Sequence, residues 1–79
     1  MFLRYGRYLV KDSGFGLEIR PVMFDPNEST KTVWLSGDDA TLCRDELADL
    51  FADLDKPGTR ASRFTPDQLA DEILAVYFD

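Results

Sequence analysis

Three aspartates, Asp45, Asp49 and Asp53, follow one another at intervals of four residues. On a helix they form one row, with a rise of about 6 Å between neighbours, and Asp38 and Glu46 lie beside it. Like charges at this spacing destabilise an isolated helix by about 0.2–0.5 kcal/mol per pair, so helix stability does not explain the row. Two interpretations remain open: a solvated helix face, or an acidic ridge that docks on a basic groove.

The residue types that usually perform catalysis are rare in this chain. It contains no histidine, which removes the most common general base and metal ligand. The only cysteine, Cys43, therefore lacks the partner that activates a nucleophilic thiol. Gly14-Phe15-Gly16 lacks the third glycine and the Lys–Ser/Thr ending of a phosphate-binding loop. We therefore expect no enzyme activity and no cofactor.

Residues 53–64 begin like a calcium-binding loop, with Asp53 at the first position and Gly58 at the sixth. The fifth position is Pro57, where an oxygen ligand is needed. The twelfth is Phe64, where the loop needs a bidentate glutamate. We therefore expect no metal site.

The charge of the chain is unevenly distributed. The 79 residues carry a formal net charge of −6. Residues 1–36 hold five basic and four acidic side chains (net +1), whereas residues 37–79 hold four basic and eleven acidic ones (net −7). Direct binding to nucleic acid is disfavoured, because it needs Lys and Arg to neutralise phosphates. A basic protein surface is the favoured partner, although solubility alone would also favour this charge.

Length and composition predict one small folded domain, residues 1–79. A hydrophobic fraction of 44% is typical of folded proteins. A single cysteine allows no intramolecular disulfide, which favours the cytoplasm. Charges interrupt the first residues too early for a signal peptide, and no apolar run approaches the roughly 18 residues of a membrane span.

The first half, residues 1–36, predicts β-strands. Three segments have the composition or the alternation of strands: residues 2–10, 16–24 and 31–35. Turn and loop signals separate them at residues 12–14 and 25–30. Pro21 cannot donate to a strand ladder, so its strand is expected at an edge or bent there. The short links favour a three-stranded antiparallel meander.

The second half, residues 37–79, predicts two helices. Residues 40–54 are rich in Leu, Ala, Asp and Glu, and lie between N-cap candidates and a Pro-Gly stop. The second helix opens at Thr65, because Thr65 and Gln68 are spaced for a capping box and Pro66 suits the first helical position. Together the two halves predict an α+β domain with both helices packed on one face of the sheet.

Apolar side chains on the predicted helices also leave two interpretations open. Cys43 lies in the apolar stripe opposite the aspartates, and is either a small core residue or a contact near the twofold axis of a homodimer. Leu74 and Phe78 lie away from the main apolar stripe of the second helix. They either fill the core from a second side or contribute to a partner or dimer surface.

In its format the chain resembles the anti-CRISPR proteins, small phage-encoded inhibitors, especially those that act on type I surveillance complexes. The resemblance covers the whole length and rests on size, an α+β layout, the lack of a catalytic motif and the acidic segment DDATLCRDELAD, residues 38–49. These inhibitors share no sequence motif. The resemblance implies action in the cytoplasm of a host bacterial cell, where carboxylates replace phosphates in the basic groove of a Cas subunit and block target DNA. It assigns this role to Asp45, Asp49 and Asp53 first, then to Asp38 and Glu46.

Two other functions stay open. The chain could be an oligomerisation or accessory subunit with apolar contacts, or an antitoxin-like regulator that neutralises a basic partner. The salt dependence of binding separates the apolar subunit from a charge-driven inhibitor, because charged interfaces weaken as salt rises. A neighbouring toxin gene would favour the antitoxin.

Overall fold

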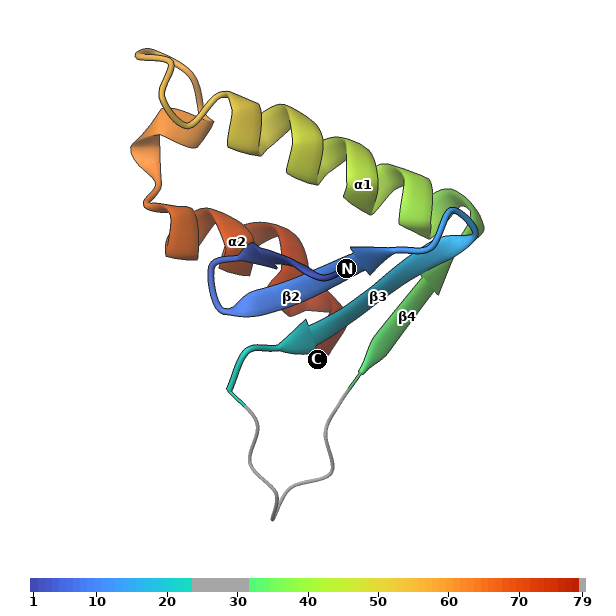
Figure 1. Ribbon diagram of the computed structural model, residues 1–79. Helices are drawn as coiled ribbons and strands as arrows, with labels where there is room; N and C mark the ends of the chain where they lie inside the picture. The colour runs from blue at the N-terminus through green and yellow to red at the C-terminus, as the bar shows by residue number, and fades with distance from the viewer. Residues whose placement is uncertain (24–31, 79) are drawn as a thin grey trace.

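The computed structural model describes residues 1–23 and 32–78, which form an antiparallel sheet with helices on one face (Figure 1). Within these residues the sheet has four strands in chain order: β1 (Leu3–Tyr5), β2 (Tyr8–Asp12), β3 (Gly16–Pro21) and β4 (Val33–Ser36). The helical elements of the described chain are α1 (Gly37–Ala52), the 3-10 turn η1 (Ala61–Arg63), α2 (Pro66–Leu74) and the 3-10 turn η2 (Ala75–Phe78). The predicted α+β class and the meander order are confirmed.

The prediction of three strands is wrong, because residues 2–10 form two strands joined by a tight turn. Gly6 adopts a left-handed backbone with φ +58°, which reverses the chain between β1 and β2. Gly6-Arg7 is not one of the dipeptides that signal a hairpin strongly, so the apolar composition around it suggested a continuous strand. The turn lies against α2, where a Cβ on Gly6 would meet the Cβ of Ala70 at 2.7 Å.

Pro21 is the last residue of an interior strand, and the chain bends directly after it at Val22 and Met23. Of the two predicted alternatives the edge position is therefore wrong, and a bend is observed next to Pro21. β3 pairs with β2 from Leu17 to Pro21, and with β4 from Gly16 to Ile19. The described pairing with β4 stops before Pro21, so the missing N–H of Pro21 interrupts no hydrogen bond of that pairing. The loop predicted over residues 25–30, and Lys31 of the predicted third strand, lie outside the described residues.

The core fills the space between the helices and the inner face of the sheet. Alternate strand residues point inward. The buried strand residues are Tyr8, Val10, Leu17 and Ile19. The helices contribute Ala40, Cys43 and Leu47 of α1, and Leu69, Ala70, Ile73 and Leu74 of α2. Both helices therefore pack on the same face, as predicted, and the opposite face of the sheet is covered by no described helix.

α1 begins three residues before the predicted start at Ala40 and ends before Asp53. Its N-cap is Ser36, and Asp38 and Asp39 lie in the first turn, where carboxylates interact favourably with the positive end of the helix. The predicted end at Leu54 came from the Pro57-Gly58 stop signal, whereas the chain already leaves the helix at Asp53 and forms a turn over residues 53–55.

α2 begins where the sequence predicts. Thr65 Oγ1 accepts a hydrogen bond from the backbone N–H of Gln68 at 3.1 Å. Gln68 Oε1 in turn accepts one from the backbone N–H of Thr65 at 3.0 Å. Pro66 is the first residue of the helix. The hydrogen bonds of this capping box lie within four consecutive residues, which explains why the sequence alone predicted the start of α2.

Candidate protein-binding site

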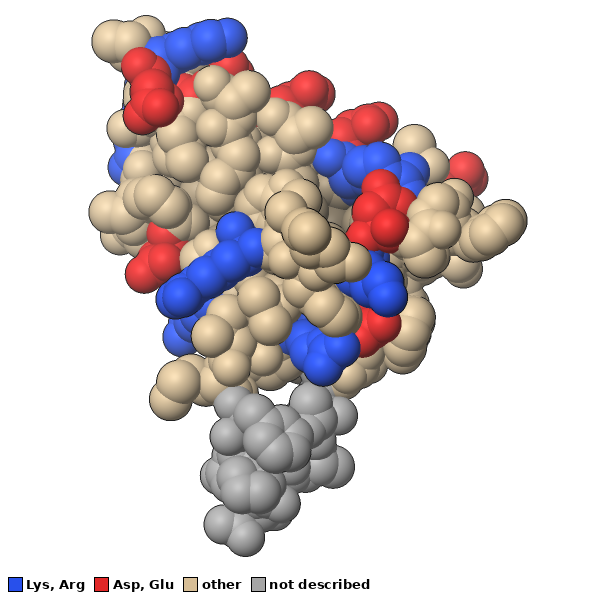
Figure 2. Space-filling view, viewed as in Figure 1, with Lys and Arg blue, Asp and Glu red and all other residues tan. Residues whose placement is uncertain are grey.

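The acidic residues of α1 lie on its outer side, opposite its buried stripe. Asp38, Asp45 and Asp49 are exposed, whereas Cys43 and Leu47 point into the core. Figure 2 shows Asp and Glu side chains along the edge of the molecule that α1 forms. Among the ion pairs of the described residues, none involves these three aspartates. Their charges are therefore available to a partner.

Asp53 is placed differently from the other predicted binding residues. It occupies the C-cap position of α1 and is half-buried. Its carboxylate lies 3.4 Å from the ammonium group of Lys56, which neutralises part of its charge. Asp53 therefore contributes less to an acidic surface than its position in the row predicts.

A groove of about 560 Å³ lies between α1 and α2. Its lining combines carboxylates with an apolar floor: Leu42, Asp45, Glu46, Asp49 and Leu50 from α1, Glu72 and Ile73 from α2, and Arg60 from the segment between the helices. Four carboxylates and one guanidinium leave a net charge of −3 (one minus four) around the groove. The structure thus brings together Asp45, Glu46 and Asp49, while Asp38 and Asp53 lie outside the groove.

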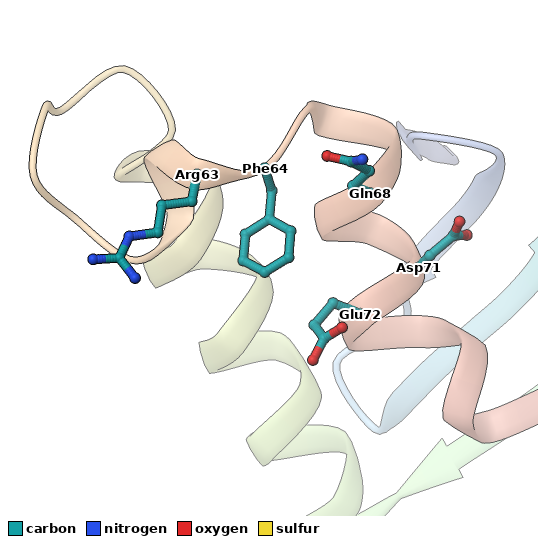
Figure 3. Close-up of a pocket in the computed structure, with 5 residues that line it drawn as sticks. All are labelled: Arg63, Phe64, Gln68, Asp71 and Glu72. Carbon is teal, nitrogen blue, oxygen red and sulfur yellow. The ribbon is translucent and has the colours of Figure 1, made fainter.

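Glu72 is the acidic residue of the groove that the sequence analysis did not single out. Figure 3 shows its side chain on the side of α2 that faces α1, whereas Asp71 points toward the strands. Arg60 lies 3.7 Å from Glu72, but both side chains are more than half exposed, so this pair is weak. The spacing from Leu69 places Glu72 at the margin of the buried stripe of α2. Only the packing of α2 on α1 shows that this margin borders the acidic groove.

A second hollow, of about 470 Å³, continues along α2. Phe64 lies between η1 and α2, Gln68 and Glu72 project from α2, and Arg63 points away (Figure 3). The two hollows share Glu72. The concave surface therefore extends beyond the acidic groove, and offers an aromatic ring at its far end.

Two exposed ion pairs join the helices to the strands and remove charges from the free surface. The Arg7 guanidinium donates to both carboxylate oxygens of Asp71 at 2.9 and 2.7 Å. Arg44 donates to those of Asp12 at 2.7 and 3.1 Å. Hydrogen bonds from the arginines lower the pKa of Asp71 and of Asp12. Because both pairs are solvent-exposed, their net contribution to stability is small.

Cys43 and Leu74 cannot form the predicted dimer contact, because the chain itself covers both completely. Leu74 packs into the core from α2, and Cys43 points into the core from α1. Phe78 is half-buried, with its ring centre 5.4 Å from that of Tyr8. Of the two interpretations of the sequence, the core position therefore applies to Cys43 and Leu74.

The burial of Cys43 leads to a testable prediction. Desolvation raises the pKa of the thiol to about 11, above that of an ordinary cysteine. At pH 8 we expect a thiol reagent to label the native protein at least about a hundredfold more slowly than the urea-unfolded protein, because both thiolate and access are lacking. Absorbance of the released chromophore measures both rates. Rapid labelling of the folded protein would show that Cys43 is accessible.

No protein-family model matches the chain, and comparisons with curated proteins and with solved structures gave no match either. Within residues 1–23 and 32–78, no group of three or more His, Cys, Asp or Glu side chains could hold a metal ion. None of the helices in this described part is long and apolar enough to cross a membrane.

Proposed function

We propose that this protein is a small inhibitor that binds a basic surface of another protein through the groove between α1 and α2. The observation that carries this proposal is the position of Asp45, Glu46 and Asp49 opposite Glu72, around an apolar floor. Two α-helices contribute to one concave acidic surface, which a helix face that is merely solvated does not require.

The lining of the groove suits long basic side chains. The carboxylates can accept hydrogen bonds from Arg or Lys, and such charge-assisted bonds are stronger than neutral ones. Leu42 and Leu50 can pack against the aliphatic stems of those side chains. Exposed Asp38 adds to the attraction at longer range, which raises the association rate more than the affinity.

The narrower form of the proposal is that the partner is the DNA-binding groove of a type I CRISPR-Cas complex. A duplex presents one charge per roughly 1.7 Å of axis. Asp45 and Asp49 differ by about 6 Å in rise along α1, so the protein is much less dense in charge than DNA. It would therefore block a few Arg and Lys side chains that contact target DNA, rather than replace a whole duplex.

The test compares two variants with the same change in net charge. The groove variant carries Asp45→Asn, Asp49→Asn and Glu72→Gln, and the control carries Asp53→Asn, Asp55→Asn and Asp67→Asn. Exposed charge pairs contribute about 0.2–1 kcal/mol each, so we expect the loss of three charges to weaken binding of the groove variant about 3- to 150-fold. The control is expected to change affinity by less than about threefold.

Binding is measured by capture of purified type I complexes at low and high salt, with target-DNA binding as the second readout. Unchanged binding by the groove variant would show that the groove is only solvated. Equal loss in both variants would point to overall charge. If no complex is captured but a basic toxin encoded beside the gene is, the partner is the toxin and the protein is its antitoxin.

A further inference from the structure

The outer face of the sheet carries charges opposite to those of α1. Strand pairing aligns two rows across this face: Arg4, Leu9 and Arg20 in one, and Lys11, Glu18 and Trp34 in the other. These residues alternate with the buried ones, so they project away from the helices. Figure 2 shows Lys and Arg side chains gathered over the strands. We call these six residues, together with Phe2, the sheet surface.

Local contacts hold the cations of the sheet surface in place. The guanidinium carbon of Arg20 lies 4.1 Å from the centre of the Phe2 ring, and the Lys11 Nζ lies 5.9 Å from it. Arg20 also donates to Glu18 at 3.0 Å. Three cations and one carboxylate give the sheet surface a net charge of +2 (three minus one), in a chain whose total is −6.

We propose that the sheet surface binds the outer face of α1 from a second copy of this chain, so that copies associate head to tail. This face of α1 presents Asp38, Asp45 and Asp49 around Leu42. Its charge is opposite to that of the sheet surface, and such complementarity favours association. Symmetric packing of two sheet surfaces is disfavoured, because it would bring the cations of one copy close to those of the other.

The two surfaces also agree in size and in the position of their apolar residues. From Asp38 to Asp49 the helix axis advances by about 16 Å. The strands from β1 to β4 span about 14 Å. Leu42 is 56% exposed between the aspartates, and Leu9 lies between Arg4 and Arg20 in the sheet surface. Trp34, which is 71% exposed, lies on the edge strand β4. An apolar centre with a charged surround is the usual arrangement of a protein interface.

The proposed contact joins two different surfaces, one from each layer of the molecule. A chain of copies keeps one free sheet surface at one end and one free α1 face at the other, so association is open-ended unless a ring closes. The proposal does not rest on the proposed function. Both use Asp45 and Asp49, however, so a basic partner and a second copy compete for the same face of α1.

Two charge-reversed variants test this arrangement by complementation. The sheet variant carries Arg4→Glu and Lys11→Glu, and the helix variant carries Asp45→Lys and Asp49→Lys. In sedimentation velocity at low salt, the mass of the wild type is expected to rise with concentration beyond that of a dimer, and to return to the monomer at high salt. Each variant alone is expected to associate at least about tenfold more weakly.

An equimolar mixture of the two variants is expected to restore association between unlike copies, because each supplies the intact surface that the other lacks and the two reversed surfaces also carry opposite charges. Trp34, the only tryptophan, reports contact at the sheet surface by its fluorescence. Circular dichroism confirms that the variants are folded, and Arg4→Gln with Lys11→Gln replaces the sheet variant if charge reversal prevents folding. This neutral variant is then expected to associate more weakly than the wild type.

Three results would overturn the proposal. They are a wild type that stays monomeric at low salt, a wild type that stops at a dimer, and a mixture in which unlike copies do not associate. Quenching of Trp34 by a single-stranded oligonucleotide without self-association would identify nucleic acid as the ligand instead. None of these results bears on the capture of a basic partner, so the failure of this proposal is distinguishable from the failure of the proposed function.

Discussion

Replacing Leu74 by alanine is expected to lower the free energy of unfolding by about 2–5 kcal/mol, because it removes a completely buried side chain and leaves a cavity. A domain of this length has a total stability of about 4–12 kcal/mol, so the variant is close to unfolding. Urea denaturation followed by far-ultraviolet circular dichroism measures the change. Leu74 belongs to α2, which also carries Glu72, so this loss also affects the acidic groove.

Leu42→Ala provides the matched control, since Leu42 is 56% exposed on α1. We expect its effect on the unfolding free energy to stay within about 0.5 kcal/mol, as at most surface positions. If Leu74→Ala were as mild as Leu42→Ala and instead abolished association of copies, Leu74 would be a dimer contact after all. The comparison of the two variants therefore distinguishes a core position of Leu74 from a position in a dimer contact, the two interpretations that the sequence left open.

Replacing Gly6 by alanine is the second change with a large expected effect. Gly6 has a left-handed backbone, and a residue with a Cβ in this conformation destabilises the folded state by about 1–2 kcal/mol. The new Cβ would also lie 2.7 Å from the Cβ of Ala70 and 3.2 Å from the Cα of Asp67, and such overpacking costs about 1–3 kcal/mol. We therefore expect a total loss of about 2–5 kcal/mol in urea denaturation.

Gly14→Ala separates the two contributions at Gly6. Gly14 also has a left-handed backbone, with φ +84°, but a Cβ there would meet no atom within 4 Å. Its replacement is expected to cost only about 1–2 kcal/mol. Equal losses in the two variants would show that the turn can move away from α2, and that the contact with Ala70 contributes nothing.

The Gly6 turn matters for the binding surfaces as well as for stability. Arg4 donates through Nε to the carbonyl oxygen of Gly6 at 2.8 Å, and Arg7 in the same turn pairs with Asp71 of α2. The turn thus connects the sheet surface to the helix that carries one side of the acidic groove. A shift of the turn would move Arg4 relative to Lys11 and Arg20, and would weaken the proposed contact with a second copy.

Local patterns in the sequence were sufficient for the α+β class, for the start of α2 and for the acidic side of α1. Thr65, Gln68 and Pro66 determine a helix start within four residues, because the hydrogen bonds involved are local. The opposition of Asp45 and Asp49 to Cys43 and Leu47 follows directly from the helical period. Strand composition and turn signals likewise predicted the meander, although not the number of strands.

Tertiary structure alone decided which charges meet. Glu72 borders the groove because α2 packs on α1, and the cations of the sheet surface gather because the register of β1, β2 and β3 aligns them. The contact of the Gly6 turn with α2 and the burial of Leu74 also follow only from the tertiary structure. Side-chain periodicity acts over a few residues, whereas strand register and helix packing depend on contacts between residues far apart in the chain. The separation of this protein into an acidic and a basic surface is therefore a property of its fold, and the net charge of −6 does not reveal it.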